Sequence, residues 1–453
     1  MTDIDSLTRR THEAFPAIRT DLETLVRIPS VSAPAFDQDQ VRASAEAVAG
    51  LLREAGMPQV DILTATTPDG DVSRPAVVAH RPGPAGAPTV LLYAHHDVQP
   101  PGPAERWTGE PFAPQERDGR LYGRGAADDK AGIMAHVGAL RVLGDSLGVG
   151  VTVFAEGEEE IGSPTFAHFL ATHADRLRAD VIVVADSNNW KVGVPALTTS
   201  LRGLVDCEVE VRVLDHAVHS GMFGGPVLDA VTLMARLIAT LHDDAGDVAV
   251  EGLVRRDDVD VDYPEDDLRA DAGVVDGYRL AGRGPITARM WRKPALSVIG
   301  LDATAVAASS NTLAPACRAK LSLRTAPGQD PAEAERLLHD HLRAHAPFGA
   351  QVTVTAGERA QAFAGPADTE AMRTARWAFR QSWGREPVDI GVGGSIPFIS
   401  DLKAVFPDAD ILVTGVEDPD SRAHSEDESV HLAELEKVVL AEALLLARLG
   451  GSL

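Results

Sequence analysis

The 453-residue chain carries 42 Lys and Arg against 67 Asp and Glu, which gives a formal net charge of −25 at pH 7. This acidic balance disfavours nucleic acid and anionic membrane surfaces as partners, and bound cations are expected to neutralise part of it. The length predicts two domains, and the hydrophobic fraction of 44% is typical of a globular protein.

Neither the first residues of the sequence nor its cysteines indicate secretion. No apolar run is long enough to span a membrane, and residues 1–15 lack the apolar core of a signal peptide, so we expect a cytoplasmic protein. Cys207 and Cys317 lie in strand-like runs away from any glycine-rich turn or base. They are predicted to be buried free thiols rather than a disulfide or a nucleophile.

The first 202 residues alternate between helix-like and strand-like segments. An amphipathic helix over residues 5–27 ends before Pro29, because a residue that precedes proline avoids the α region. The segments that follow are a helix at 38–55, strands at 60–65, 76–80 and 89–94, a helix at 129–143, a strand at 149–155, a helix at 164–173 and a strand at 180–185. This alternation predicts an α/β fold with a mainly parallel sheet flanked by helices on both faces.

The pattern changes after Gly203 and returns near residue 359. Residues 204–214 alternate apolar and polar side chains at a period of two, as a half-buried strand does. The segments that follow are a helix at 227–241, an acidic irregular stretch at 243–294, a strand at 316–324, a helix at 331–345 and a strand at 351–355. We interpret residues 203–358 as an inserted α+β sandwich domain, and residues 1–202 and 359–453 as one catalytic domain.

The resumed first domain continues the α/β pattern. Its segments are a helix at 368–383, a strand at 387–390, a helix at 397–404, a strand at 410–414 and a helix at 432–449.

Five polar groups are candidate site residues, because four of them follow apolar, strand-like runs. The four are His95 to Asp97, Glu158 to Glu160, Asp186 and His424, and the fifth, Asp128, lies in a glycine-rich turn before a helix. In open α/β sheets ligands bind beyond the carboxyl ends of the strands, so these groups are expected to form one site. In an extended strand His95 and Asp97 share a side and His96 points away.

Each group also has a plainer interpretation when it is taken alone. His95 could be a structural histidine, the three glutamates a solvated helix start, Asp186 a helix cap and His424 an exposed histidine. The turn before Asp128 could be a phosphate loop, but it lacks the GxxxxGK[ST] spacing. Together the groups predict a two-metal hydrolase. One His, one Asp and a second, shared Asp would bind the first ion, and the shared Asp, one Glu and one His would bind the second. Such ligands suit Zn²⁺ and accept Mn²⁺ or Co²⁺.

The chain resembles the M20 family of metallopeptidases, and most closely its carnosinase and cytosolic non-specific dipeptidase branch. The resemblance runs in order over nearly the whole chain. The matching stretches are AHHDVQP at 94–100, LYGRGAADDK at 121–130, EGEEEIGS at 156–163, LRG at 201–203, HSG at 219–221, SLR at 322–324, GGSIP at 393–397 and AHS at 423–425.

The resemblance implies a role for each residue of the site. His95, Asp128 and Asp186 would bind one metal ion, and Asp128, Glu160 and His424 the other. Glu159 would be the general base and Asp97 the carboxylate that supports His95. The Asp128–Asp129 peptide is expected to be cis, as in relatives.

The inserted domain would be a lid and dimerisation domain. His219 resembles the lid histidine that reaches the active site of the partner subunit, so we expect a homodimer. The resemblance implies substrate contacts for four further residues, with Arg324 and Asn311 anchoring the substrate carboxylate and Gly394 and Ser395 lining the pocket. Members of the carnosinase branch often have Thr where this chain has Asn311, and Asn there is more like the bacterial deacylases.

The predicted reaction is hydrolysis of a peptide bond in dipeptides or similar small peptides that bear a free carboxylate. Two cations would lower the pKa of a bridging water, and Glu159 would take its proton. One alternative is an N-acyl- or N-carbamoyl-amino-acid amidohydrolase, which Asn311 favours, whereas the insertion at 243–294 favours the dipeptidase. A metal-binding protein without catalysis is disfavoured because Glu159 and Asp97 are not needed merely to hold metal.

Overall fold

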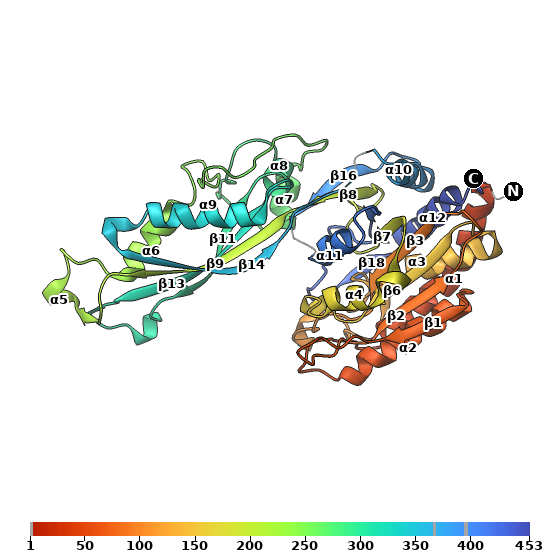
Figure 1. The fold of residues 1–453 in the computed structure, drawn as a ribbon, viewed down its shortest axis with the longest axis horizontal. Helices are drawn as coiled ribbons and strands as arrows, with labels where there is room; N and C mark the ends of the chain where they lie inside the picture. Colours follow the sequence, from red (N-terminus) through yellow and green to blue (C-terminus); the bar gives the residue numbers. More distant parts are fainter. Residues whose placement is uncertain (1–2, 366–367, 394–396) are drawn as a thin grey trace. The chain divides into compact units, whose positions relative to one another are not determined.

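The structure is a computed structural model that describes residues 3–365, 368–393 and 397–453 (Figure 1). The chain divides into two compact units. The first unit consists of Met1–Thr199, Gly365–Ile390 and Asp401–Leu453. The second unit consists of Ser200–Ala364 and Gly391–Ser400. The catalytic and lid roles proposed for the two parts of the sequence stay predictions.

The first unit is built on a mixed sheet whose central strands are parallel. The strand order is β1 (Gln59–Leu63), β2 (Ala76–Arg81), β6 (Gly150–Glu156), β3 (Thr89–His95), β7 (Val181–Val184), β17 (Asp410–Val413) and β8 (Ala196–Leu201), with β16 (Val388–Val392) also paired to β8. Strands β6, β3, β7 and β17 run parallel to one another, whereas β1, β2 and β8 pair antiparallel with their neighbours. The predicted α/β fold with a parallel central sheet is confirmed.

Helices cover the first sheet on both faces. Their bounds are α1 (Ile4–Val26), α2 (Gln38–Glu54), α3 (Lys130–Leu143), α4 (Phe166–Leu177), α10 (Glu370–Trp383), α11 (Pro397–Val405) and α12 (Leu432–Leu449). Helices α1, α3 and α12 pack on one another in Figure 1, and their apolar side chains meet Val90, Leu92 and Ala94 of β3 in the main core. Because side chains alternate along a strand, Tyr93 and His95 belong to the opposite face.

That opposite face carries aromatic side chains and the end of β3. Phe154 of β6 stacks on Phe169 of α4 with ring centroids 5.2 Å apart, and Tyr93 meets Phe154 edge-on at 5.6 Å. A smaller sheet of β18 (Ser429–His431), β5 (Arg120–Tyr122) and β4 (Gln115–Arg117) pairs chain segments from the two ends of the first unit. This pairing brings the loop before β18, which contains His424, to the turn that follows β5 and contains Asp128.

The second unit is an antiparallel sheet with helices on one face. Its strands lie in the order β11 (Ala295–Asp302), β13 (Ala316–Thr325), β9 (Gly203–Arg212) and β14 (Gln351–Ala360). The helices are α5 (Ser220–Phe223), α6 (Ala230–Ala239), α7 (Glu265–Asp271), α8 (Ile286–Trp291) and α9 (Pro331–Ala344). Two short strands, β10 (Val218–His219) and β12 (Thr312–Leu313), pair with each other, and β15 (Phe363–Ala364) pairs with the last residues of β8. Helices α6 and α9 bury the apolar side chains of β9 and β13, including both free cysteines.

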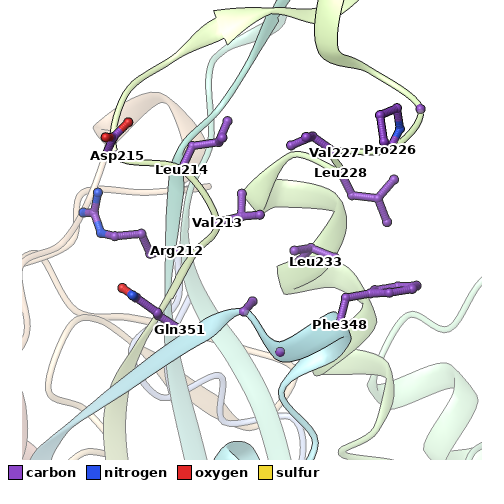
Figure 2. Close-up of a pocket in the computed structure, with 13 residues that line it drawn as sticks. Arg212, Val213, Leu214, Asp215, Pro226, Val227, Leu228, Leu233, Phe348 and Gln351 are labelled. Atoms are coloured by element: carbon purple, nitrogen blue, oxygen red, sulfur yellow. The ribbon is translucent and has the colours of Figure 1, made fainter.

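A pocket of about 640 Å³ opens in the second unit between the end of β9, the loop before α6 and the turn at Phe348 (Figure 2). Figure 2 shows Arg212 and Asp215 on one side of it and Phe348 and Leu233 on the other. None of the residues that line the pocket is a predicted site residue, and we assign it no ligand.

The secondary-structure predictions were incomplete. The sequence analysis predicted none of the strands β4, β5, β8, β10, β12, β15 and β18. The stretch at 243–294 is not wholly irregular, because it contains α7 and α8, which are too short to show helical periodicity. Strand β11 was not predicted, because it is an edge strand whose last six residues are exposed and therefore do not alternate. In the described part of the chain no helix is long and apolar enough to cross a membrane. The cytoplasmic location stays a prediction.

Candidate metal centre

The carboxyl ends of the parallel strands bring the predicted ligands together. His95 is the last residue of β3, Glu159 and Glu160 begin a 3-10 turn shortly after β6, and Asp186 follows β7. His424 comes from the long loop after β17, in left-handed backbone with a φ of 62°. These strands are neighbours in the sheet, so side chains at their ends must converge at one edge.

Asp128 lies at the centre of this arrangement. Its Oδ1 lies 3.0 Å from Nε2 of His95, and its Oδ2 lies 3.0 Å from Nε2 of His424. The second histidine also lies 3.2 Å from Oε2 of Glu160. One carboxylate therefore contacts a different imidazole through each oxygen, as a bridging ligand of two ions would. The predicted cis peptide between Asp128 and Asp129 is present.

The donor set fits a divalent cation. His95, Asp128 and Glu160 each place one nitrogen or oxygen within 4.8 Å of the other two. Imidazole nitrogens with carboxylate oxygens are the ligands that Zn²⁺ takes, and Mn²⁺ accepts them as well.

Charge at the site also favours a cation. Burial raises the pKa of Asp186 to about 6, and the charge of Asp128 adds to this effect. Burial and the same aspartate raise the pKa of Glu160 to about 7. Hydrogen bonds to Asp128 and Glu160 raise the pKa of His424 to about 11. Carboxylates that repel one another so strongly are stabilised by positive charge among them, and a divalent ion supplies it.

Glu159 lies beside the ligands but is held differently. Its Oε2 is 3.9 Å from Nε2 of His95, and burial, followed by the charges of nearby carboxylates, raises its pKa well above the usual value. Asp97 accepts hydrogen bonds from the backbone amides of Glu159 at 3.2 Å and Glu160 at 3.0 Å. Asp97 Oδ1 also lies 3.4 Å from His95 Nδ1. This buried carboxylate thus links the first histidine to the glutamate turn, whereas His96 turns away and contacts the carbonyl of Pro75 at 2.8 Å.

The structure adds residues that the sequence analysis missed. Gln99 binds both oxygens of Glu160, through its backbone amide at 3.0 Å and its side-chain amide at 2.8 Å. Glu417 follows β17, and burial, together with the charges of Asp128 and Asp186, raises its pKa well above the usual value. Glu428 accepts hydrogen bonds from the turn that carries Asp128. Only the position of Glu417 just beyond a strand end could have drawn attention to it in the sequence.

The remaining predicted residues lie in the second unit or outside the described residues. His219 and Asn311 are neighbours, because the backbone amide of Ser220 donates to the carbonyl of Asn311 at 2.9 Å and β10 pairs with β12. Both are exposed, and Arg324 is half-buried on β13. Gly394 and Ser395 lie outside the described residues.

The fold and the site define a metal-dependent hydrolase. The family described as Peptidase family M20/M25/M40 matches residues 91–448. The Cysteinylglycine-S-conjugate dipeptidase of Corynebacterium striatum is 36% identical over 371 residues, which cover 80% of this chain and 82% of that protein. The chain therefore belongs to this peptidase family and is a hydrolase, as predicted.

One further relative agrees with this assignment, and one solved structure shares the fold. The human Beta-Ala-His dipeptidase is 28% identical over 424 residues, covering 88% of this chain and 82% of that protein. The solved structure of the di-peptidase Dug1p from Saccharomyces cerevisiae superposes with a TM-score of 0.79 at 21% identity and covers 99% of both chains. The likeness to the dipeptidase and carnosinase branch is confirmed.

Proposed function

We propose that this protein is a two-metal dipeptidase that hydrolyses the peptide bond of small peptides with a free carboxylate. The observation that carries the proposal is the position of Asp128, whose two oxygens each lie 3.0 Å from the imidazole of a different histidine. A carboxylate held in this way suits a pair of ions that share it. The relatives' names support the substrate class, since both the Corynebacterium and the human protein are named as dipeptidases.

The resemblance to M20 peptidases implies the set of metal ligands, and the contacts of Asp128 with His95 and His424 support it. His95, Asp128 and Asp186 would hold one ion, and Asp128, Glu160 and His424 the other, with Zn²⁺ favoured by the donor set and Mn²⁺ or Co²⁺ also compatible. When bound, a pair of such ions polarises a carbonyl and lowers the pKa of water.

The chain's own residues would move the proton and hold the geometry. Glu159 lies beside the ligands without a hydrogen bond to either histidine, and its raised pKa suits a group that accepts a proton from water and then donates it to the leaving amine. Asp97 would fix both His95 and the glutamate turn, because it contacts each of them. The base and the ligands would therefore keep their spacing through a turnover.

The carboxylate of the substrate would be bound by Arg324. On β13 the residues Cys317, Ala319, Leu321 and Leu323 enter the core of the second unit, so Arg324 projects from the other face of the sheet. A planar guanidinium binds both oxygens of a carboxylate at once. Dipeptides and N-acyl amino acids both carry a carboxylate in the leaving group, so Arg324 fits either substrate class. Asn311 favours N-acyl amino acids.

The proposed site needs residues from two copies of the chain. Arg324 pairs with Leu204 at one end of the β13–β9 ladder, and His219 and Asn311 lie beyond Ala316 at the other end. At about 3.3 Å per residue, Arg324 and Ala316 are roughly 26 Å apart, so one chain cannot bring His219 and Arg324 to the same dipeptide. A homodimer in which His219 serves the partner's site removes this conflict.

A substrate panel tests the proposed function. The zinc- or manganese-loaded protein would be assayed for amide hydrolysis with free dipeptides, β-alanyl-histidine, and N-acetyl, N-succinyl and N-carbamoyl amino acids. Turnover of free-amine dipeptides is expected. Cleavage of the acylated compounds alone would replace the dipeptidase with the amidohydrolase alternative, and two bound metals without any turnover would favour a non-catalytic role.

A further inference from the structure

Glu428 is a fully buried carboxylate that accepts four hydrogen bonds from one turn. Its Oε1 accepts from the backbone amides of Ala127 at 3.0 Å and Asp128 at 3.1 Å. Its Oε2 accepts from the amide of Gly125 at 3.0 Å and from Nη1 of Arg124 at 2.6 Å. An ionised carboxylate offers about four acceptor positions, so this side chain is fully engaged with the turn that carries Asp128.

Arg124, the ionic partner of Glu428, extends the same network to two other loops. Its Nη2 donates to the carbonyl of Ser425, next to His424, at 3.2 Å and to the carbonyl of Pro100 at 3.4 Å. Its side chain is 2% exposed. The loop after β3, the turn of Asp128 and the loop of His424 therefore meet at one buried ion pair.

We propose that the Arg124–Glu428 ion pair is the positioning unit of the metal centre, and that Glu428 sets the place of Asp128 by holding its backbone. The inference rests on the proposed function only in taking Asp128 as the ligand shared by two ions. Glu428 does not reach the reacting atoms. It fixes the backbone of Asp128 and of the residues just before it, so that one carboxylate oxygen faces His95 and the other faces His424.

The chemistry of the contacts explains why a carboxylate is required. All four partners of Glu428 are donors, and three of them are backbone amides in the turn that carries Asp128. A glutamine has one acceptor oxygen and an amide group that only donates, so it would face at least one of these N–H groups with a second donor. Loss of a residue that orients a metal ligand typically costs metal affinity about 10–100-fold.

The test compares Glu428→Gln with a matched control in the same long loop. Asp418 is also a buried carboxylate paired with an arginine, Arg120, at 3.0 Å, but the other partners of Arg120 are Ser421 and Ser429. The substitution Asp418→Asn therefore makes the same chemical change to a buried ion pair without touching the turn of Asp128. Zinc affinity is measured by competition with a chromophoric chelator, and amide exchange of residues 123–129 is measured in the metal-free protein.

The expected result is a loss of zinc affinity of roughly 10–100-fold and faster exchange of the turn in Glu428→Gln, with Asp418→Asn within about threefold of the wild type. Wild-type affinity and exchange in Glu428→Gln, or equal losses in Asp418→Asn, would overturn the proposal. A wild-type protein that binds no zinc would instead contradict the proposed function, and the exchange data would still decide the role of Glu428.

If Glu428→Gln does not fold, a second variant tests the same proposal. Replacing both partners, Arg124→Met with Glu428→Met, leaves no unpaired buried charge, and such replacements preserve stability far better than single ones. The double variant lacks the acceptors for the turn, so the same loss of zinc affinity is expected. A folded double variant with wild-type affinity would refute the positioning role.

Discussion

The backbone amide of Glu159 donates to Oδ1 of Asp97 at 3.2 Å, and the same oxygen lies 3.4 Å from Nδ1 of His95. Asp97 therefore does more than orient an imidazole. It joins the end of β3 to the turn after β6, so that the proposed base and the first histidine are held by one buried carboxylate. A change in the side chain of Glu159 leaves this backbone contact in place.

The first prediction concerns the base itself. Glu159→Gln keeps the size of the side chain and the amide contact with Asp97 but cannot accept a proton. We expect kcat for dipeptide hydrolysis to fall about 10²–10⁴-fold, because general base catalysis contributes a factor of this size. Metal content, measured by mass spectrometry of the purified protein, should remain that of the wild type.

The neighbouring Glu158 supplies the control. Its Oε1 accepts from the amide of Thr165 at 3.0 Å and its Oε2 from the amide of Arg74 at 2.9 Å, so it anchors the start of α4. Glu158→Gln should lower the unfolding temperature while kcat stays within about threefold of the wild type, since the cost is that of a lost hydrogen bond. Comparable losses of kcat in both variants would remove Glu159 from the role of base.

The second prediction is that zinc binding releases protons. The pKa of Glu160 is raised to about 7 and that of Asp186 to about 6, and the pKa of His424 is raised to about 11. Metal ligands must be deprotonated, so the ion has to displace these protons, and its affinity should fall as the pH is lowered from 8 to 5. Calorimetry in buffers of different ionisation enthalpy measures the number released, and a binding enthalpy independent of the buffer would contradict the prediction.

Most of the first unit could be predicted from sequence because its elements carry strong local patterns. Helix α12 was predicted with the observed bounds, and β3 and β6 were placed within one residue at each end. Strand β11 has neither continuous burial nor alternation, because one of its edges and most of its side chains face solvent. The antiparallel pairing of β1, β2 and β8 at the two sides of the first sheet depends on contacts between distant parts of the chain, which local sequence patterns do not predict.

The site shows the same division between local and distant information. His95, Asp128 and Glu160 could be proposed because each stands in a compact motif at the end of a strand or in a turn. In the sequence Glu428 is one of several acidic residues in a polar loop. Its hydrogen-bond partner Asp128 lies 300 residues earlier in the chain, so no local pattern indicates the contact. Gln99 likewise acquires its contact with Glu160 only through folding. Residues that hold ligands in place are therefore harder to predict than the ligands.

The third prediction concerns stability and pH. Glu156 is buried, accepts a hydrogen bond from the hydroxyl of Tyr93 at 2.7 Å, and has a pKa raised by burial from 4.5 to about 8. The folded state thus binds this proton more tightly than the unfolded state does. The resulting stability is complete below about pH 4.5 and is lost as the pH rises through about 8.

Glu156→Gln removes the titration and keeps an acceptor for Tyr93. Relative to the wild type, the free energy of unfolding of the variant should rise with pH, by on the order of a few kcal/mol between pH 5 and 8. Urea denaturation of both proteins without metal, at a series of pH values, measures the difference. A constant difference across this range would show that Glu156 does not carry the proton.

The fourth prediction concerns the substrate carboxylate. Arg324→Met should raise KM for dipeptides about 10–100-fold, the value of a hydrogen bond to a charged group, and should leave KM for the corresponding dipeptide amides unchanged. Arg318 is the control, because it projects from the same face of β13 and pairs with Asp302 at 2.7 Å on the surface. Arg318→Met should have the KM of the wild type. If Arg324→Met raised KM equally for dipeptides and for dipeptide amides, Arg324 would not bind the carboxylate.

The last prediction tests whether His219 acts on the partner subunit. The separate variants His219→Ala and Glu159→Gln should each be nearly inactive. If the proposed homodimer exchanges His219 between subunits, a mixed dimer contains one complete site, with Glu159 from the first variant and His219 from the second. Random assortment makes half of the dimers mixed, so the mixture should recover about a quarter of the wild-type turnover. Co-refolding the two variants in equal amounts and measuring kcat per subunit gives the answer, with each variant refolded alone as the control. A mixture no more active than its components would mean that His219 does not serve the partner's site, and the separation of His219 from Arg324 within one chain would then require another explanation.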